Sequence, residues 1–207
     1  MMNRVAITGG IACGKSLFSR FLADLGVEII DADDVVHRLE APGGEAVPIL
    51  KELFGAKVIG VDGGIDRRAL GAMVFSDDTV RAKVNKVLHP LVRDIIDKWF
   101  ARAGGTLRAA VIPLLFEAGW QDVWDVIICL VAGKDLQIER LTCGRGLTRD
   151  EAERRVAAQI PEAEKAARSH IVINNKSDAA ALAKSAEEVY RLLTERAYEY
   201  RTNKPGT

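Results

Sequence analysis

Short, continuous apolar runs alternate with amphipathic stretches along this chain. Uninterrupted runs of this kind are typical of strands that are buried on both faces of a parallel sheet. Five occur: RVAITG from Arg4, VEIIDAD from Val27, RAAVIPLLF from Arg108, DVIICLVAG from Asp125 and HIVINN from His170. Helical periodicity covers residues 15–25, 79–102, a stretch from 134, 148–159 and 179–200. Strands that alternate with helices predict an α/β protein with a doubly wound parallel sheet.

Two regions do not fit the simple alternation of strands and helices, and they divide the chain. Residues 35–102 have no clear buried strand and carry a long helical run, so we expect them to form a helical region that covers a bound substrate. Residues 137–168 are dense in Arg and Glu, follow the fourth strand, and are expected to form a lid. A T-x-x-E capping box at Thr148 and Glu151 predicts one helix start there. Residues 1–34, 103–136 and 169–207 remain as the core.

The composition limits the classes of partner. Hydrophobic residues make up 48% of the chain, and 29 Lys and Arg balance 29 Asp and Glu. A globular protein without a bulk positive field is expected, with neither nucleic acid nor an anionic membrane as partner. Three distant cysteines without a C-x-x-C pair favour reduced thiols and a cytoplasmic location. No signal-peptide pattern and no apolar run of the roughly 20 residues that cross a bilayer is found, which predicts a soluble protein.

The stretch AITGGIACGKSLF joins the first apolar run to the first helix. Gly9 to Ser16 match G-x-x-x-x-G-K-[ST], the P-loop pattern, in which backbone N–H groups cradle phosphate oxygens. Lys15 would reach the outer phosphates, and the Ser16 hydroxyl would bind Mg²⁺. The alternative is a glycine-rich turn with an exposed lysine. Strand, loop and helix in the required order favour phosphate binding.

Two carboxylates follow the second apolar run. Asp31 and Asp33 project to the same side if the strand continues through them, and one could then take a proton from an attacking hydroxyl. The carboxyl ends of parallel strands are where ligands gather in open α/β sheets. The alternative is an acidic strand end that caps the next helix, and we expect Asp34 to be solvated or capping.

Cationic side chains are candidates for stabilising a transferring phosphoryl group. Arg140 and Arg145 in the predicted lid are the preferred ones, because Glu–Arg pairing on a surface helix explains Arg154 and Arg155. His89 precedes Pro90, which predicts that it lies at a helix start. A substrate contact is a better role for His89 than catalysis.

Residues 175–178 spell NKSD, which is the guanine-specificity pattern of GTPases. Those proteins also resemble one another in a D-x-x-G turn, and no Asp of this chain has Gly three residues later. The GTPase interpretation therefore fails. Asp178 is expected to cap the C-terminal helix.

Taken in order, these segments resemble dephospho-coenzyme A kinases over nearly the whole chain. The resemblance rests on TGGIACGKS, LGVEIIDADDVVH, APGGEA, FGAKVI, RRALGAMVFSD, LHPLVR, VIPLLFE, QIERL, AAQIPEAEK and IVINN. It implies a P-loop kinase of the nucleotide-kinase type, with a five-stranded parallel sheet flanked by helices, a helical acceptor-binding insertion and a lid. It also implies phosphorylation of the ribose 3′-hydroxyl of dephospho-CoA by ATP with Mg²⁺, the final step of coenzyme A synthesis.

The resemblance further implies roles for individual residues. Asp33 would be the base and Asp31 would assist it, Arg140 would lie where the lid begins, and Asn175 would lie near the adenine. ATP phosphates would be bound by Gly10, Ile11, Ala12, Cys13, Gly14, Lys15 and Ser16. The acceptor would be surrounded by His89, Arg93, Pro113, Leu114, Leu115 and Glu117.

The chain departs from the family pattern inside the loop. Ala12 and Cys13 stand where Gly-Ser is usual, which a backbone cradle tolerates provided that Ala12 need not adopt positive φ. Two alternatives stay open: a kinase on the same core with another small-metabolite or nucleoside monophosphate acceptor, and a regulatory module that hydrolyses nucleotide slowly. The oligomeric state is also left open.

Overall fold

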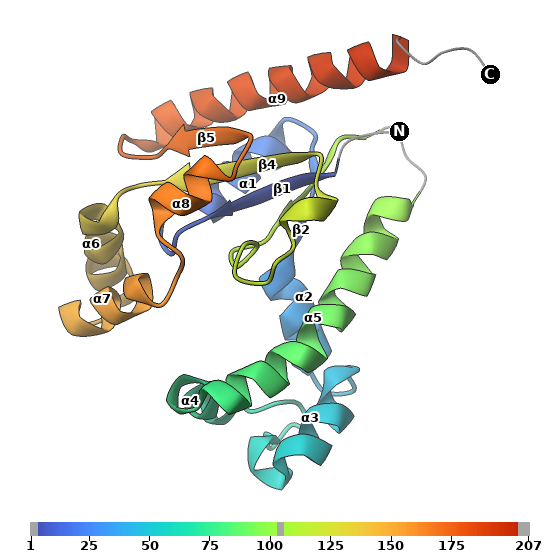
Figure 1. Cartoon of the computed structure of the whole chain (residues 1–207), viewed down its shortest axis with the longest axis vertical. Coiled ribbons are helices and arrows are strands. Elements are labelled where there is room, and N and C mark those ends of the chain that lie inside the picture. The colour runs from blue at the N-terminus through green and yellow to red at the C-terminus, as the bar shows by residue number, and fades with distance from the viewer. Residues whose placement is uncertain (1–3, 103–105, 203–207) are drawn as a thin grey trace. The chain divides into compact units, whose positions relative to one another are not determined.

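The structure, a computed structural model, describes residues 4–102 and 106–202. The chain divides into two compact units (Figure 1). Residues 1–30 together with 103–207 form the first, called here the sheet unit, and residues 31–102 form the second, called the helical unit.

The core of the sheet unit is a five-stranded parallel sheet in the order β2-β3-β1-β4-β5 (Figure 1). Its central strand β1 aligns Ile7 with Val111 of β3 and with Ile128 of β4. All five predicted strands are confirmed, because the runs that lack alternation are those with helices on both faces. The strands are β1 (Val5–Gly9), β2 (Glu28–Asp31), β3 (Arg108–Val111), β4 (Val126–Val131) and β5 (Ile171–Asn174).

Two helices pack together and contribute to the main hydrophobic core of this unit. They are α1 (Lys15–Asp24) and α9 (Ala179–Thr202). Phe18 and Leu22 of α1 and Leu182 and Leu193 of α9 are buried against the strands. Burying one such side chain stabilises the fold by about 1.5–3 kcal/mol. The side chain of Asp178 accepts from the Ala181 N–H, which confirms the predicted cap of α9.

Three further helices follow β4. α6 (Lys134–Arg145) and α7 (Arg149–Ala157) pack on each other, and α8 (Glu162–Ala167) packs against β4 and β1. The capping box of Thr148 and Glu151 is confirmed at the start of α7. Ile138 and Leu141 of α6 and Ala152 of α7 form a small core, and Ile11 and Ala12 pack against it. The predicted lid region therefore has its own apolar contact with the glycine-rich loop.

The helical unit contains α2 (Ala32–Glu40), α3 (Ala46–Phe54), the 3₁₀ turn η1 (Ala56–Val58), α4 (Arg67–Ser76) and α5 (Asp78–Ala101). The buried residues of α5, namely Val84, Leu88, Val92 and Ile96, recur every four positions and form one apolar stripe. Asp66 and Asp77 cap α4 and α5 with their side chains.

The expected helix start at His89 is wrong. Pro90 lies inside α5, which runs without interruption from Asp78 to Ala101. The apolar stripe places Leu88 and Val92 in the core and leaves Pro90 exposed. A proline removes one backbone N–H bond from the helix, and here the packed stripe on either side outweighs that loss.

Candidate active site

The glycine-rich loop lies between β1 and α1, at the carboxyl end of the central strand. Lys15 is the first residue of α1, so the first-turn N–H groups of the helix have no partner within the helix. The positive end of the helix dipole lies at the same point. Gly14, the residue before the helix, has φ 96°, a conformation that favours glycine.

Side-chain donors hold five consecutive carbonyl groups of this loop. Lys15 Nζ donates to the Gly9 and Gly10 carbonyls at 3.0 and 2.8 Å. Gln137 Nε2 donates to the Ile11 carbonyl at 2.8 Å, and Arg140 donates to the Ala12 carbonyl at 3.2 Å. The next carbonyl, that of Cys13, accepts from Asn175 Nδ2 at 2.9 Å. Side chains of the protein thus satisfy these carbonyl oxygens as acceptors, as a loop that presents its N–H groups to an anion requires.

The glycines of the loop allow these side chains to approach. A Cβ atom at Gly10 would collide with the amide of Gln137, and one at Gly14 would collide with the amide of Asn175. In the P-loop pattern, glycines let phosphate approach the backbone closely. The structure adds that they leave room for the side chains that hold the loop from its other side.

Ala12 does adopt positive φ, at 56°. The condition under which the Ala12 and Cys13 replacements would be free of cost is therefore not met. A non-glycine residue in the left-handed region lowers the stability of the fold by on the order of 1 kcal/mol. Ala12 keeps this conformation because Arg140 binds its carbonyl and the small core of α6 and α7 packs against it.

Lys15 and Ser16 differ in their exposure. The Lys15 side chain is 9% exposed and its ammonium group lies over the loop carbonyls. Ser16 is exposed at the helix start, so its hydroxyl is accessible to a ligand. Among the residues that the structure describes, no three His, Cys, Asp or Glu side chains form a metal-binding group. A single hydroxyl beside bound phosphates fits Mg²⁺, which keeps several waters and uses few protein ligands.

Cys13 is buried inside the loop. Burial raises the pKa of its thiol, against the lowering effect of the Lys15 ammonium group, whose Nζ lies 3.9 Å from the sulfur. Burial also raises the pKa of Cys129 on β4 to about 11. A raised pKa favours the protonated form of a thiol at neutral pH; of the free cysteines, Cys13 and Cys129 are buried and Cys143 is exposed.

Arg140 and Arg145, the two preferred lid arginines, are placed differently. The guanidinium group of Arg140 bridges the Ala12 carbonyl and, at 3.1 Å, the Asn175 carbonyl. Arg145 is the last residue of α6 and is exposed. The loop therefore has one arginine in direct contact.

A pocket of about 210 Å³ lies beside that arginine, on the α1 side of the loop. Asn175 is buried, and its backbone N–H donates to the Val131 carbonyl at 2.7 Å. The pocket is lined by Ala12, Gly14, Leu17, Arg140, Asn175, Ser177, Asp178 and Ala179.

Asp31 and Asp33 do not share a strand face. β2 ends at Asp31, and Asp33 belongs to the first turn of α2. The Asp31 carboxylate accepts from the Asp33 N–H at 2.8 Å, so the capping alternative holds for Asp31. The expectation that the strand continues is wrong because Asp31 is a strong helix N-cap. Asp33 and Asp34 are both exposed.

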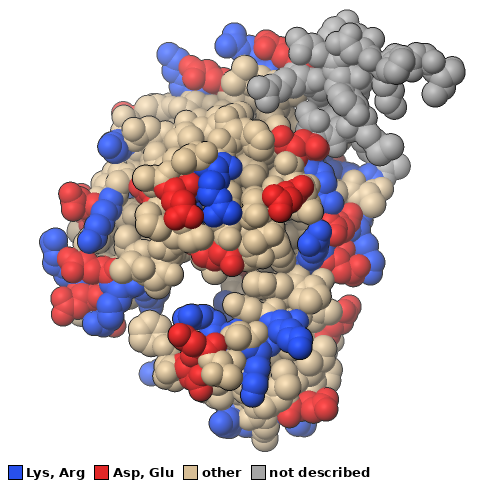
Figure 2. Space-filling model, viewed as in Figure 1, with Lys and Arg blue, Asp and Glu red and all other residues tan. Residues whose placement is uncertain are grey.

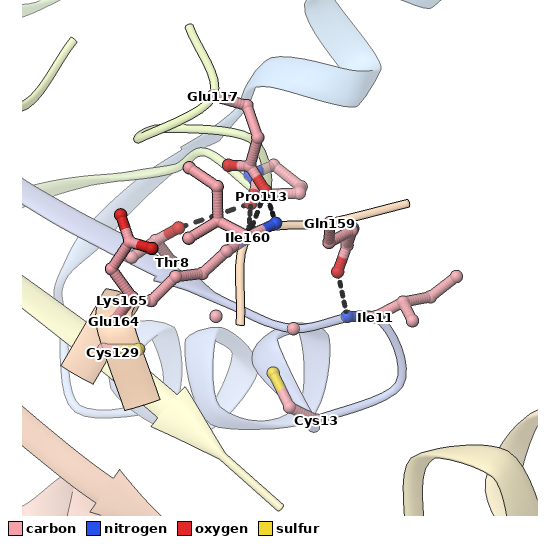
Figure 3. Close-up of polar contacts among 12 residues, drawn as sticks. Thr8, Ile11, Cys13, Pro113, Glu117, Cys129, Gln159, Ile160, Glu164 and Lys165 are labelled. Carbon is pink, nitrogen blue, oxygen red and sulfur yellow. Dashed lines mark hydrogen bonds and ion pairs between the residues drawn. The ribbon is translucent and has the colours of Figure 1, made fainter. Parts of the chain in front are cut away.

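The segment after β3 carries Pro113, Leu114, Leu115 and Glu117. Leu115 is buried in the core, whereas Leu114 is 48% exposed. The Glu117 carboxylate lies 2.7 Å from Nζ of Lys165, and it accepts from the Ile160 N–H at 3.1 Å (Figure 3). Thr8 at the end of β1 and Lys165 both donate to the Pro113 carbonyl, at 3.4 and 3.5 Å. Glu117 thus holds this segment in place.

His89 and Arg93 lie one turn apart on α5 in the helical unit. His89 is half-buried, and desolvation lowers the pKa of its imidazole. Arg93 is exposed and lies 3.7 Å from the carboxylate of Asp97.

Four polar residues at the loop or at the Pro113 segment were not predicted as site residues. Gln137, Gln159, Glu162 and Lys165 lie within QIERL and AAQIPEAEK, so the resemblance contained the signal. The Gln159 side chain accepts from the Ile11 N–H at 2.8 Å (Figure 3). Glu162 accepts from the N–H groups of Ala132 and Gly133 at 3.1 and 2.8 Å. Gly10, Gln137, Gln159 and Glu162 also line a second pocket, of about 270 Å³.

Neither positive nor negative side chains dominate the face of the molecule that Figure 2 shows. Lys and Arg side chains lie intermixed with Asp and Glu side chains there, in keeping with the balanced composition (Figure 2). None of the helices within residues 4–102 and 106–202 combines the length and the apolar character that a membrane span needs.

The parallel sheet, the phosphate loop on its central strand and the lysine at the helix start together define a P-loop kinase of the nucleotide-kinase type. The sequence pattern of the dephospho-CoA kinases matches residues 3–181. The chain belongs to the dephospho-CoA kinase family, whose members phosphorylate dephospho-CoA with ATP in the final step of coenzyme A synthesis.

Individual relatives agree with this assignment. The dephospho-CoA kinase of Geobacter sulfurreducens is 38% identical over 192 residues, which cover 91% of this chain and 98% of the relative. The solved structure of TT1252 from Thermus thermophilus has a TM-score of 0.81 at 32% identity, covering 93% of this chain and 98% of that one. The structure of dephospho-CoA kinase from Campylobacter jejuni has a TM-score of 0.69 at 25% identity and covers 95% and 100%.

Proposed function

We propose that the chain transfers the γ-phosphoryl group of Mg-ATP to the ribose 3′-hydroxyl of dephospho-CoA through the residues described above. The observation that carries the proposal is the phosphate loop, with its carbonyl groups held by side chains and its helix start open to an anion. Such a loop binds the phosphates of a nucleotide, and the family supplies the identity of the acceptor.

Asp33 is the proposed base. Its carboxylate is exposed on the first turn of α2, and its own N–H is held by Asp31. Asp31 therefore assists by fixing the backbone that carries Asp33. The base removes the proton from the acceptor hydroxyl as the hydroxyl attacks the γ-phosphorus in line.

Lys15 and Arg140 are the proposed stabilisers of the transferring charge, with Arg145 as the second lid arginine. Lys15 reaches the phosphates by exchanging its bonds to the Gly9 and Gly10 carbonyls for bonds to phosphate oxygens. Ser16 would hold Mg²⁺, which neutralises charge on the β- and γ-phosphates when it is bound. Asn175 and the 210 Å³ pocket beside it are the proposed place of the adenine.

His89, Arg93, Pro113, Leu114 and Leu115 are the proposed acceptor contacts. Glu117 acts on the same segment through its ion pair with Lys165. Residues 35–102 would form the acceptor region, 137–168 the lid, and the rest the nucleotide core. We further propose that the protein works in the cytoplasm, without nucleic acid or membrane partners.

The test is ADP release from Mg-ATP by the purified chain, with dephospho-CoA, AMP, CMP, shikimate or no acceptor, and with the product identified by mass. Release that requires dephospho-CoA and yields CoA is the expected result. Release with another acceptor would replace the substrate assignment. Release without any acceptor would favour the regulatory module.

Asp33→Asn removes the proposed basic carboxylate and keeps a side chain of nearly the same size. We expect a loss of at least about a hundredfold in kcat with nearly unchanged ATP affinity, because general-base catalysis contributes roughly 10²–10⁴-fold. Asp34→Asn is the matched control, since Asp34 is also exposed on the first turn of α2. Equal turnover in the two variants would exclude Asp33 as the base.

A further inference from the structure

The geometry points to Gln137 as a positioning residue that aims a backbone N–H of the phosphate loop. Gln137 lies on α6, is 2% exposed, and donates to the Ile11 carbonyl at 2.8 Å. Its role rests on the proposed function, because it acts through the loop that binds the phosphates.

The peptide unit that joins Ile11 to Ala12 is planar and trans. The Ile11 carbonyl and the Ala12 N–H belong to one peptide unit and point in opposite directions. A donor that holds the Ile11 carbonyl on one side therefore turns the Ala12 N–H to the other side. Gln137 supplies that donor, and a buried neutral amide does so without adding a charge that would compete with Lys15 for phosphate.

The two neighbouring peptide units are fixed in the same way. Arg140 holds the Ala12 carbonyl from one turn further along α6, and Asn175 holds the Cys13 carbonyl. Three successive N–H groups, those of Ala12, Cys13 and Gly14, thus point away from the side chains that hold the carbonyls. The Cys13 N–H donates to the Gly10 carbonyl at 3.4 Å and closes a turn. The N–H groups of Ala12 and Gly14 therefore remain to donate to a ligand.

The peptide unit before Ile11 is also held. The Ile11 N–H is donated to Gln159, from the segment between α7 and α8. Ile11 is therefore bracketed by two glutamines of the lid region, and neither flanking peptide unit can rotate without breaking a bond. Gln137 can approach the loop because Gly10 has no Cβ atom. The glycine of the loop and the glutamine of α6 therefore depend on each other.

Binding of ADP tests this assignment without an acceptor. Gln137→Met removes the N–H donor and keeps a buried side chain of similar length. We expect the Kd for ADP to rise roughly tenfold and the downfield shift of the Ala12 amide proton on ADP binding to shrink. In turnover, the KM for ATP should rise and kcat fall, while the KM for dephospho-CoA stays within about twofold.

Two variants serve as controls. Gln121→Met makes the same change on η2, outside the loop, and should leave ADP binding and the Ala12 shift as in the wild type. Gln137→Leu also removes the donor and adds no charge, so it should repeat the effect of Gln137→Met. A merely structural role would lower the folded fraction and leave the Kd of the folded protein unchanged.

A measurement on the wild-type chain needs no variant. The side-chain amide protons of Gln137 should exchange with solvent much more slowly than those of Gln121. Equal exchange rates, or variants that bind ADP with wild-type Kd and wild-type Ala12 shift, would overturn the role of Gln137. ADP binding with the expected losses but no product from dephospho-CoA would leave this role standing and refute the acceptor assignment.

Discussion

Ala12 is the residue of the phosphate loop that adopts a conformation its side chain disfavours. Its φ of 56° is the one positive value at a non-glycine position within the described residues. The alanine stays there because Arg140 holds its carbonyl and the small core of α6 and α7 packs against it. Strain that persists in this way requires that the surrounding contacts determine the backbone more strongly than the residue does.

Ala12→Gly should therefore stabilise the protein. Relief of the left-handed strain, about 1–2 kcal/mol, exceeds the extra entropy that glycine gives the unfolded chain, about 0.4–1 kcal/mol. We expect a net gain of roughly 0.5–1 kcal/mol in the free energy of unfolding, measured in urea. Ala82→Gly, at an exposed helical position of α5, should lose about 1 kcal/mol. A loss at both positions would contradict the strain at Ala12.

His89 gives stability a pH dependence. Its pKa in the folded chain is lowered by burial, so the unfolded chain binds the proton more readily. The folded state is consequently destabilised as the pH falls below about 6.5, the pKa of an unperturbed histidine, and is unaffected above it. Urea unfolding at pH 7.5 and 5.5 should show a larger loss for the wild type than for His89→Gln. Equal losses would mean that His89 stays solvated in the fold.

At the scale of elements, predictions from the sequence succeeded where neighbouring residues alone determine the local structure. The apolar runs specify strands, and the Thr148–Glu151 and Asp178 caps specify helix starts, because each depends on neighbouring residues only. Predictions failed where a local preference competed with packing. Pro90 suggested a boundary that the stripe of α5 overrides, and Asp31 ended the strand that we had extended through Asp33.

Gln137, Gln159 and Lys165 show a different limit. A polar residue in a helical pattern normally predicts a solvent-exposed face, and nothing in the periodicity reveals that its side chain will bond to a partner more than 40 residues away. The P-loop motif predicted which backbone segment forms the loop between β1 and α1. The side chains that orient this backbone come from α6, from the segment between α7 and α8, and from the turn after β5, and only the fold brings them there.

Lys165 on α8 and Glu117 after β3 provide a prediction about how these elements are joined. Lys165 is fully buried, whereas Glu117 is 21% exposed. Glu117→Gln leaves a buried ammonium group without its counter-ion and should cost roughly 3 kcal/mol. Lys165→Met leaves a carboxylate that water can still reach and should cost less, about 1–2 kcal/mol. Urea unfolding of both single variants and the double variant gives the coupling, and the opposite ranking would refute the argument.

At the scale of the whole molecule, the proposed site residues are distributed over the two units. The sheet unit contains the phosphate loop, both lid glutamines and the 210 Å³ pocket, and the helical unit carries Asp33, His89 and Arg93. Each unit has buried apolar side chains of its own, with the stripe of α5 in the helical unit and the α1–α9 layer in the sheet unit. Nucleotide binding should therefore depend on the sheet unit.

Mg-ATP should raise the thermal unfolding midpoint of the full chain in the absence of acceptor. A ligand at a hundred times its Kd stabilises the folded state by about 2.7 kcal/mol, and a chain of this size gains about 2–4 °C per kcal/mol. The expected rise is thus roughly 5–10 °C. Lys15→Ala should reduce it, because the lysine is the loop's own cation, whereas Arg93→Ala in the helical unit should leave it unchanged. If Arg93→Ala abolished the rise and Lys15→Ala did not, nucleotide binding would have to be reassigned from the phosphate loop to the helical unit.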